Sequence, residues 1–449
     1  MSFSLDDSHD SLETFLRSHS PNEPEFHQAV VEVMEDVKPI IDQSEVYKSA
    51  NVFKRLVEPE RMISFQVAWQ TDAGDVEVNR GYRVQFNGAI GPYKGGLRFH
   101  PSVNPSVLKF LAFEQTFKNA LTGLPMGGAK GGSDFDPKGR SEAEIMRFCM
   151  AFMQELQRHI GPNIDIPAGD INVGAREIGY LFGSYRRIKG KFEGVLTGKE
   201  QSFAGSAMRT EATGYGVMYF LSEMLKAHDQ TVEGKTVLIS GAGNVATYAA
   251  EKAIDLGAKV ITLSDSSGFI HDPDGMTQEK IDWVRAHKAQ SGASLKSYTD
   301  EFGGSWTEGE TPWSVKADVA VPCATQNELH KSDAEKLVEN GITAVIEGAN
   351  MPTTTDAKAV FSKGGILFAP GKAANAGGVA VSGLEISQNR IRRSKTADQV
   401  ESELEGIMSD IHEACREEGR RDGKIDYAKG ANIAGFRKVA DAMVSQGIG

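Results

Sequence analysis

Three lysines lie in or beside an unusually glycine-rich zone, Gly88–Gly132, of this 449-residue chain. Lys94 and Lys130 are each followed by two glycines, and Lys118 lies on a helix predicted between them. Glycine removes bulk beside a side chain, so a small ligand or the backbone can approach closely. Three ammonium groups converging there would form a cationic pocket, which suits a substrate with more than one carboxylate.

Plainer interpretations of these residues stay open. Lys118 could pair with Glu114 on a solvated helix face, and Lys94 and Lys130 could be ordinary loop lysines. Gln115, three residues before Lys118, shares its helix face.

Two aspartates are candidates for a proton-transfer partner. Pro167-Ala-Gly-Asp170 places a carboxylate in a tight loop, and Asp165 is a rival of the same type. An acid near a desolvated lysine is a natural proton-transfer pair. Asp170 could instead cap the helix that follows, and composition does not decide between the two aspartates.

A glycine motif in the second half indicates a dinucleotide site. The segment Gly241-Ala-Gly243-Asn-Val-Ala246 fits GxGxxG/A and lies between a predicted strand and a predicted helix. Gly241 permits the tight turn, Gly243 lets the backbone approach a pyrophosphate, and Ala246 allows close packing. The helix N-terminus would offer N–H groups to the phosphates, and Asp265 follows at the spacing of a ribose ligand.

The alternative for this motif is a structural turn without a ligand. A non-catalytic dinucleotide sensor would keep the turn but would have no need for Lys130 and Asp170 beside glycines. A change in nicotinamide absorbance on adding a substrate with more than one carboxylate would distinguish an enzyme from a sensor.

The elements that position these residues form two groups. Residues 1–60 are predicted to be helical, and alternation over Gly81–Asn87 predicts a half-buried strand. Two helices are predicted after it, at Ser106–Leu121 and Ser141–His159. From about Thr231, strands alternate with helices as in a doubly wound sheet, with strands expected at Val237–Ser240, Val260–Ser264, Val319–Val321, Ala344–Ile346 and Ile366–Phe368.

We therefore predict an α/β protein of two domains. The change of pattern places the boundary near Gly205–Thr210, and a last helix, Gly430–Ile448, could return to either domain. With the family resemblance given below, residues 1–205 and 425–449 would form an N-terminal α/β substrate and oligomerisation domain. Residues 206–424 would form a Rossmann-type doubly wound dinucleotide-binding domain.

Bulk properties exclude several classes. The net charge of −12, without a basic stripe, argues against a nucleic-acid partner. Three cysteines without CxxC spacing predict neither disulfides nor a metal site. Without a signal peptide or an apolar run of bilayer length, we expect a cytoplasmic protein and no membrane partner.

The motifs together resemble the glutamate dehydrogenase family. Leu124–Pro137 matches the family's active-site signature throughout, and the resemblance extends from about Pro24 to the C-terminus. It is most similar to the short, hexameric, NADP-dependent bacterial members. Further family-like stretches are Gly91–His100, Pro167–Asp170, Arg209–Gly216, Glu347–Pro352 and Asn375–Ser382.

The resemblance implies a role for each site residue. Lys130 would activate the water that attacks an iminium intermediate, and Asp170 rather than Asp165 would exchange protons with the substrate nitrogen. Lys118 and Gln115 would bind the α-carboxylate of the substrate, and the Gly169 backbone would lie near its amino group. Lys94 and Ser382 would bind the γ-carboxylate. The residues that would contact the cofactor are Thr213, Asn244 and Asn350.

The resemblance also implies substrates, cofactor and assembly. Glutamate, 2-oxoglutarate and ammonia would be the small-molecule partners, in ammonia assimilation by a homohexamer. Asp265 alone favours NAD, but the related NADP enzymes tolerate it and bind the 2′-phosphate through residues that map to Ser266 and Lys288. NADP is therefore expected over NAD, although Ser294 stands where an arginine is often found.

The nearest rival is a dehydrogenase of leucine, valine or phenylalanine. An apolar substrate needs apolar walls, whereas a γ-carboxylate needs a cation and a hydroxyl. Lys94 and Ser382 supply both and favour glutamate.

Overall fold

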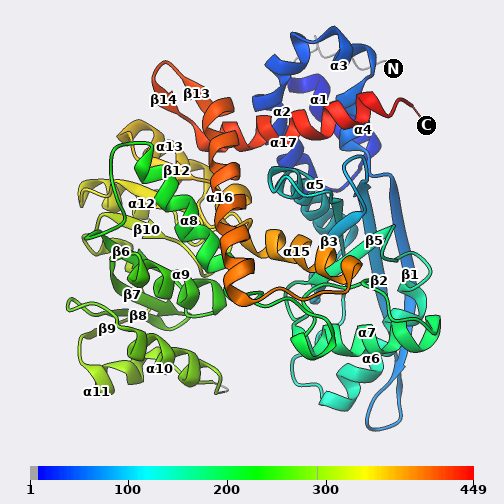
Figure 1. The fold of residues 1–449 in the computed structure, drawn as a ribbon, viewed down its shortest axis with the longest axis horizontal. Helices are drawn as coiled ribbons and strands as arrows, with labels where there is room; N and C mark the ends of the chain where they lie inside the picture. The colour runs from blue at the N-terminus through cyan, green and yellow to red at the C-terminus, as the bar shows by residue number, and fades with distance from the viewer. Residues whose placement is uncertain (1–8, 291, 449) are drawn as a thin grey trace. The chain divides into compact units, whose positions relative to one another are not determined.

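The computed structural model describes residues 9–290 and 292–448, which form two compact units. The first unit contains the chain up to Ala207, the segment Ser382–Thr396, and the residues from Asn432 on. The second contains Met208–Val381 and Ala397–Ala431. Figure 1 shows helices packed around a sheet in each unit.

This division differs from the predicted one at two segments and by two residues at the first boundary. Residues 206–207 and 382–396 belong to the first unit, and residues 425–431 belong to the second. At two of the crossings, the chain passes between the units inside a helix, α15 (Gly377–Ile391) and α17 (Tyr427–Ser445). A crossing within a helix lacks the polar, Pro- or Gly-rich linker that normally marks a boundary.

The first unit is built on a five-stranded sheet of order β1-β2-β4-β3-β5. Strands β3, β4 and β5 are parallel, and β1 and β2 run antiparallel to their neighbours. The strands are β1 (Arg61–Gln70), β2 (Val76–Asn87), β3 (Tyr93–Phe99), β4 (Gly127–Ser133) and β5 (Asp165–Gly169). The helices are α1 (His9–His19), α2 (Pro24–Asp42), α3 (Glu45–Ser49), α4 (Val52–Val57), α5 (Pro105–Leu121), α6 (Glu142–Leu156) and α7 (Ala175–Lys189).

Helices cover both faces of this sheet. Leu97 and Phe99 of β3 join a core with residues of α6 and α7. On the other face, Phe86 of β2 packs edge-on against Phe113 of α5, with ring centroids 5.6 Å apart. A sheet with both faces covered forces buried polar side chains on it to find partners within the protein.

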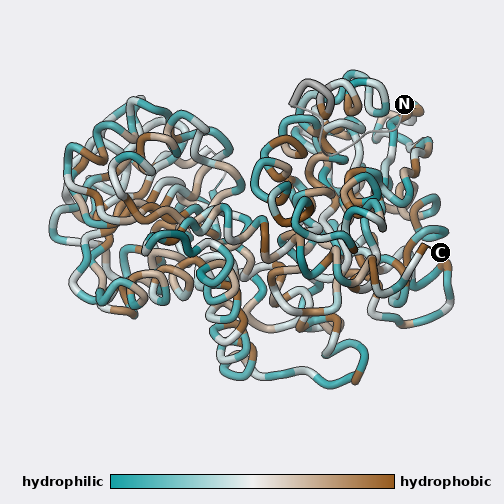
Figure 2. The backbone as a smooth tube through the Cα atoms, turned by 90° about the horizontal axis from the view of Figure 1, so that it is seen from above, coloured by the Kyte–Doolittle hydropathy of each residue, from teal (hydrophilic) through white to brown (hydrophobic). Residues whose placement is uncertain are grey.

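The second unit contains a seven-stranded sheet of order β12-β11-β10-β6-β7-β8-β9. Strands β6, β7, β10, β11 and β12 are parallel, and β8 and β9 are antiparallel additions at one edge. The strands are β6 (Thr236–Ile239), β7 (Lys259–Asp265), β8 (Gly268–His271), β9 (Ser305–Glu308), β10 (Val319–Val321), β11 (Ala344–Ile346) and β12 (Leu367–Ala369). In Figure 2 the strands inside this unit are brown, whereas its outer loops and helices are largely teal.

Helices flank this second sheet, as a doubly wound fold requires. They are α8 (Ala212–Lys226), α9 (Asn244–Asp255), α10 (Gln278–Lys288), α11 (Tyr298–Phe302), α12 (Lys331–Glu339), α13 (Thr355–Gly364), α14 (Gly371–Ala374) and α16 (Ala397–Gly419). After β7 the chain adds β8 and β9 at that edge and then returns to the other side of β6 to form β10, so the strand order reverses between β6 and β10. Ligands of doubly wound sheets bind at the carboxyl ends of strands beside such a reversal.

Most predicted elements are confirmed to within a few residues, and two predictions are wrong. Of the predicted helical stretch 1–60, residues 1–8 lie outside the described residues, and α1–α4 follow. The glycine-rich zone is not mainly loop, because it forms β3 and β4. Residues 81–87 of β2 are buried on both faces rather than half-buried. Among the described residues, we find no helix long and apolar enough to cross a membrane.

Candidate active site

Strand register places the candidate residues of the first unit on one face of its sheet. Lys94 of β3 lies opposite Gly128 of β4 and Ile166 of β5, in parallel pairs without a register shift. Side chains alternate between faces along a strand, so Lys130 shares the face of Gly128, and Asp170 that of Ile166. Lys94, Lys130 and Asp170 therefore point to the same side, as does Arg98.

The side chains of Lys130, Arg98 and Asp170 meet at the carboxyl ends of these strands. Lys130 Nζ donates to Asp170 Oδ1 over 2.9 Å, and Arg98 Nε donates to Asp170 Oδ2 over 2.7 Å. Exposed fractions of these side chains are only 6% for Lys130, 15% for Arg98 and 16% for Asp170. Each carboxylate oxygen thus has its own cation in a largely desolvated setting.

Burial and charge shift the pKa values of this cluster in opposite senses. Desolvation lowers the pKa of Lys130, and the Arg98 charge lowers it further, against the opposing effect of Asp170. Burial by itself would raise the pKa of Asp170, but the charges of Lys130 and Arg98 and their hydrogen bonds outweigh it and lower that pKa. The arrangement suits a lysine that loses its proton beside a carboxylate that is ionised before the reaction begins.

The rival carboxylate, Asp165, lies on the opposite face of the sheet. It accepts from Arg83 Nη2 at 2.5 Å, from Arg83 Nε at 2.8 Å and from Gln85 Nε2 at 3.0 Å. The side chains of Arg83 and Asp165 are both 0% exposed. Asp165 is therefore held within a closed ion pair, which also explains why the polar side of β2 is buried.

Asp170 does not cap the helix that follows it. The N-cap of α7 is Gly174, whose N–H is bound by the Glu177 side chain at 2.9 Å. The helix-capping interpretation of Asp170 is therefore wrong.

The glycines beside the lysines make room for backbone. A Cβ at Gly95 would lie 1.6 Å from Ala129 O, and one at Gly132 would lie 2.0 Å from Arg98 O. At Gly128 the obstacle would be Thr116 Oγ1 of α5, at 1.9 Å. These glycines bring β3, β4 and α5 together and so fix where Lys94 and Lys130 stand.

Helix α5 adds Gln115 and Lys118 beside the same strands. Asn119 Nδ2 donates to Lys94 O at 3.0 Å and to Gly127 O at 2.6 Å, which ties the helix to the start of β3 and β4. Gln115 Nε2 donates to Asn119 Oδ1 at 2.7 Å. Gln115 and Lys118 are half-buried, whereas the Lys94 side chain is fully buried.

Ser382 belongs to the first unit and is buried at the start of its part of α15. A Cβ at the next residue, Gly383, would lie 2.5 Å from Leu124 Cδ1 and 3.0 Å from Met126 Cε. The segment that leads into β4 therefore packs against the helix that carries Ser382.

A buried ion pair fastens α15 one turn further on. Lys199 Nζ lies 2.6 Å from Glu385 Oε1, with side chains 1% and 0% exposed. Gly198 N also donates to Glu385 Oε2, over 2.9 Å.

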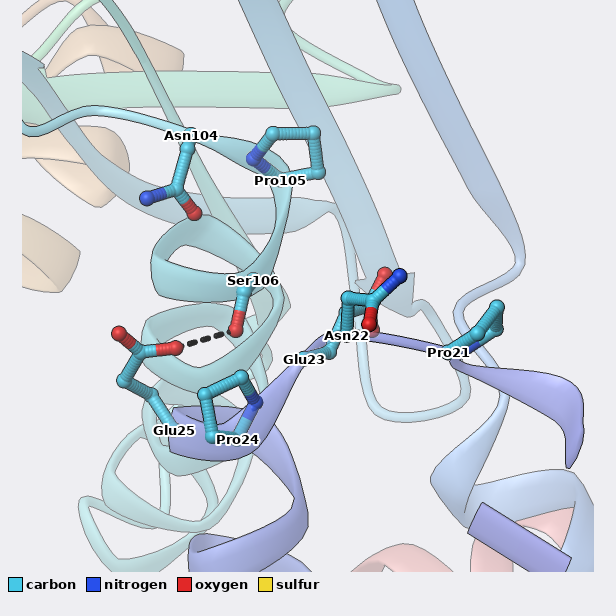
Figure 3. Close-up of a pocket in the computed structure, with 8 residues that line it drawn as sticks. All are labelled: Pro21, Asn22, Glu23, Pro24, Glu25, Asn104, Pro105 and Ser106. Atoms are coloured by element: carbon cyan, nitrogen blue, oxygen red, sulfur yellow. Dashed lines mark hydrogen bonds between the residues drawn. The ribbon is translucent and has the colours of Figure 1, made fainter. Parts of the chain in front are cut away.

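Two of the cavities formed by the described residues lie in the first unit. One of about 830 Å³ is lined in part by Asp170, together with His100, Asp136, Lys138, Arg176 and Glu177. The other, of about 470 Å³ and shown in Figure 3, lies at the N-termini of α2 and α5. There Glu25 accepts from Ser106 at 2.5 Å and Glu23 accepts from Lys109 at 2.6 Å, so the lining presents carboxylates and does not suit a dicarboxylate ligand.

In the second unit the glycine turn follows β6 directly, beside the strand-order reversal. Gly241 has a φ of +83° and packs near the end of β10, so the turn itself requires glycine there. Gly243 is the N-cap of α9 with ordinary extended dihedrals, and a Cβ there would meet nothing within 4 Å. The protein's own packing does not require glycine at 243, which leaves space for an external group at the helix N-terminus. Asn244 is exposed beside it, and Ala246 is buried.

Asp265 ends β7, and donors surround its carboxylate. It accepts from Ser267 N at 2.9 Å, Ser267 Oγ at 2.6 Å and Leu295 N at 2.9 Å. Lys288 Nζ lies 3.2 Å from Asp265 Oδ2 and also donates a hydrogen bond to Ala293 O. Ser266 is exposed. Burial opposes ionisation of Asp265, but these hydrogen bonds dominate and lower its pKa.

Thr213 and Asn350 lie in the second unit as well. A Cβ at Gly378 would lie 2.5 Å from Thr213 Oγ1, so α8 and α15 approach closely at this hydroxyl. Asn375 Nδ2 donates to Asn350 Oδ1 at 3.0 Å and to Gly348 O at 3.0 Å. Asn350 is thereby held through its oxygen, and its amide nitrogen is the group left to turn outward.

The sequence motifs contain Arg98 and Asn375, but no local signal predicts a role for either residue. Within the described residues, no group of three or more His, Cys, Asp or Glu side chains has the arrangement of a metal site.

Comparisons with known proteins agree with this geometry. Residues 59–187 match the dimerisation-domain model of the Glu/Leu/Phe/Val dehydrogenases, and residues 204–447 match the model of the Glutamate/Leucine/Phenylalanine/Valine dehydrogenase domain. The chain is 56% identical to the NADP-specific glutamate dehydrogenase of Escherichia coli, over 98% of this chain and 99% of that protein. It is 54% identical to the NAD-specific glutamate dehydrogenase of Bacteroides fragilis, over 96% and 98%. Among solved structures, Plasmodium falciparum glutamate dehydrogenase aligns with a TM-score of 0.96 at 48% identity, over 99% of this chain and 96% of that one.

Proposed function

The chain belongs to the glutamate/leucine/phenylalanine/valine dehydrogenase family, and we propose that it interconverts L-glutamate with 2-oxoglutarate and ammonia, using NADP. The observation that supports this most directly is the desolvated cluster of Lys130, Asp170 and Arg98 beside the buried Lys94. Initial rates of nicotinamide reduction with glutamate against leucine, each with both cofactors, test it. Faster turnover of leucine would contradict it.

In this proposal the residues of the first unit divide the chemistry. Lys94 and Ser382 bind the γ-carboxylate, Lys118 and Gln115 bind the α-carboxylate, and the Gly169 backbone lies by the amino group. Charge-assisted contacts at both ends fix the length of the substrate as well as its charge.

Proton transfers then fall to Asp170 and Lys130. Asp170 takes a proton from the substrate ammonium group, so that the nitrogen lone pair can form the C=N bond as the hydride leaves Cα. Neutral Lys130 takes a proton from the water that attacks this iminium carbon, which gives a carbinolamine. Asp170 then returns its proton to the nitrogen, the C–N bond breaks and ammonia departs, and the hydroxyl oxygen forms the carbonyl of 2-oxoglutarate as its proton passes to solvent. A lysine titrates near ~10.4 in water, so this role needs the lowered pKa that burial and Arg98 give it.

The residues of the second unit fit a dinucleotide. When bound, the nicotinamide cofactor supplies the hydride acceptor. Gly241, Gly243 and the exposed N-terminus of α9 would hold its pyrophosphate, with Thr213, Asn244 and Asn350 as further contacts. The unobstructed space beside Gly243 supports this assignment.

The substrate pocket can be tested by changing both γ-carboxylate residues. Lys94→Leu together with Ser382→Val should lower kcat/KM for glutamate by about tenfold or more and improve norleucine or methionine. The double variant leaves the buried γ-carboxylate of glutamate without partners, which costs about 1–3 kcal/mol or more of binding free energy. Steady-state rates with the three substrates provide the measurement, with Lys38→Leu on α2 as the matched control. An unchanged preference for glutamate in the double variant would refute the pocket assignment.

Cofactor preference tests Ser266 and Lys288. Lys288→Glu should raise the KM for NADP by about tenfold while leaving kcat near normal, because two carboxylates would then oppose the 2′-phosphate. Lys259→Glu, at an exposed lysine at the start of β7, provides the control. The ion pair between Lys288 and Asp265 supports the assignment, since it offsets the aspartate charge that would repel the phosphate. Equal or better rates with NAD in the unmutated enzyme would instead make Asp265 the ribose ligand.

Self-association as a homohexamer, a cytoplasmic location and a role in ammonia assimilation complete the proposal. The β1–β2 hairpin supports association, since edge strand β1 is ten residues long and Met62, Val76 and Val78 are 44%, 70% and 58% exposed. Long exposed edge strands are commonly covered by pairing. Light scattering of the purified protein gives the mass that tests this assembly.

A further inference from the structure

Two cations face one carboxylate in the catalytic cluster, and only one of them can release a proton there. Lys130 Nζ lies 2.9 Å from one oxygen of Asp170, and Arg98 Nε lies 2.7 Å from the other. A guanidinium keeps its proton at any pH at which an enzyme works, whereas a buried ammonium can lose its proton. The two contacts are therefore not equivalent.

We propose that Arg98 is a positioning residue that serves as the permanent counter-ion of Asp170 and leaves the carboxylate oxygen facing Lys130 as the one that exchanges protons. This inference rests on the proposed function of Lys130 and Asp170. It assigns Arg98 a part in the reaction without contact to the substrate.

Charge balance explains why such a counter-ion is needed. If Asp170 had Lys130 as its only cationic partner, the ion pair would hold the lysine protonated and prevent it from acting as a base. With Arg98 present, loss of the Lys130 proton leaves Arg98 and Asp170 as a neutral pair. Asp170 therefore keeps a cationic partner when Lys130 has lost its proton, and the buried carboxylate is not left alone.

Geometry fixes the position of this counter-ion. Arg98 lies four residues after Lys94 on β3, so both side chains point to the face that carries Lys130. The backbone of Arg98 packs directly against β4, because a Cβ placed at Gly132 would lie only 2.0 Å from Arg98 O. This close packing fixes the position of the arginine's backbone. The guanidinium is therefore carried by a rigid strand rather than by a mobile loop.

Other charged groups surround the cluster but do not replace Arg98. The Arg83 charge also lowers the pKa of Lys130, yet its guanidinium is bound to Asp165 on the other face of the sheet. The remaining titratable groups nearby are Lys94 and Lys118 on the substrate side, Arg176 and Glu177 on α7, and His100, Asp136 and Lys138 around the cavity.

Arg98→Gln removes the charge and keeps a hydrogen-bond donor. Without Arg98 the pKa of Asp170 and that of Lys130 should both rise, because a cation that favours the carboxylate and disfavours the ammonium is gone. The rising limb of kcat/KM for glutamate should then move to higher pH by roughly one unit or more. At neutral pH kcat should fall about tenfold or more, whereas KM for NADP should stay unchanged.

Arg98→Lys separates charge from structure. It keeps a positive charge until its own ammonium loses a proton, so its pH limb should move by less than the unit expected for Arg98→Gln, even if kcat falls. Arg140→Gln removes an ion-paired arginine elsewhere in the unit, next to Glu77, and should move nothing. Thermal unfolding establishes that each variant is folded, and if Arg98→Gln does not fold, Arg98→Lys alone decides.

The outcomes distinguish this inference from the proposed function. An unmutated enzyme without glutamate-dependent nicotinamide reduction would overturn the proposed function. An active unmutated enzyme with an unmoved limb in folded Arg98→Gln, or a limb shifted by about one unit or more in Arg98→Lys, would overturn only the role of Arg98.

Discussion

Replacing Lys130 by alanine should lower kcat by about 10²–10⁴-fold while NADP and glutamate binding remain measurable, because the variant loses its general base. The protein should still fold, since Asp170 keeps Arg98 as a partner at 2.7 Å and no buried carboxylate is left alone. Initial rates at saturating glutamate and NADP measure the loss, and binding titrations measure the retained affinity.

Two further measurements sharpen this result. Lys130→Arg keeps the positive charge but cannot release a proton, so it should be almost as inactive as alanine. Small primary amines added to Lys130→Ala should restore part of the rate if the lost group is a base. Near-normal turnover in folded Lys130→Ala contradicts the assignment of Lys130.

Asp170→Asn should cause a loss of similar size, about 10²–10⁴-fold in kcat. The amide is nearly isosteric, and its oxygen can still accept from Arg98. Its nitrogen would then face Lys130, where it can only donate and cannot take the substrate's proton. Rates across pH measure the effect, since no pH should restore the activity.

Asp165→Asn provides the matched comparison on the other face of the sheet. It breaks a fully buried ion pair with Arg83, which costs about 3–5 kcal/mol of folding free energy. Its effect should therefore appear in chemical denaturation, with turnover per folded molecule largely kept. If folded Asp165→Asn lost its turnover and Asp170→Asn kept it, the choice of carboxylate would be wrong.

Much of the fold could be predicted because its signals are local. The strands of the second unit are short apolar runs between turn residues, and Val319–Val321 and Ala344–Ile346 were predicted to the residue. The strands of the first unit were missed at β3 and β4, because glycine disfavours strands intrinsically. There, close contact with neighbouring backbone outweighs that local preference.

The site could be predicted by residue type but not by partner. Lysines beside glycines and an aspartate in a turn indicate acid–base chemistry from the sequence alone. The five-residue spacing of Asp165 and Asp170 places them on opposite faces only once β5 is known to be a strand. The half-buried strand predicted over Gly81–Asn87 would leave its polar side, which includes Arg83, exposed. Nothing local shows that a carboxylate distant in sequence lies beside Arg83 and buries this side.

The crowded glycines of β3 and β4 limit how this enzyme can change over generations. Substitutions at Gly95, Gly128 or Gly132 would push strands or α5 apart. Such variants should fail to fold, whatever their effect on catalysis would have been. Lys94 and Ser382, by contrast, would act on the substrate through their side chains, and neither is a glycine that neighbouring backbone crowds. New substrate preferences should therefore arise at the far end of the substrate, while the proton-transfer half of the site is inherited unchanged.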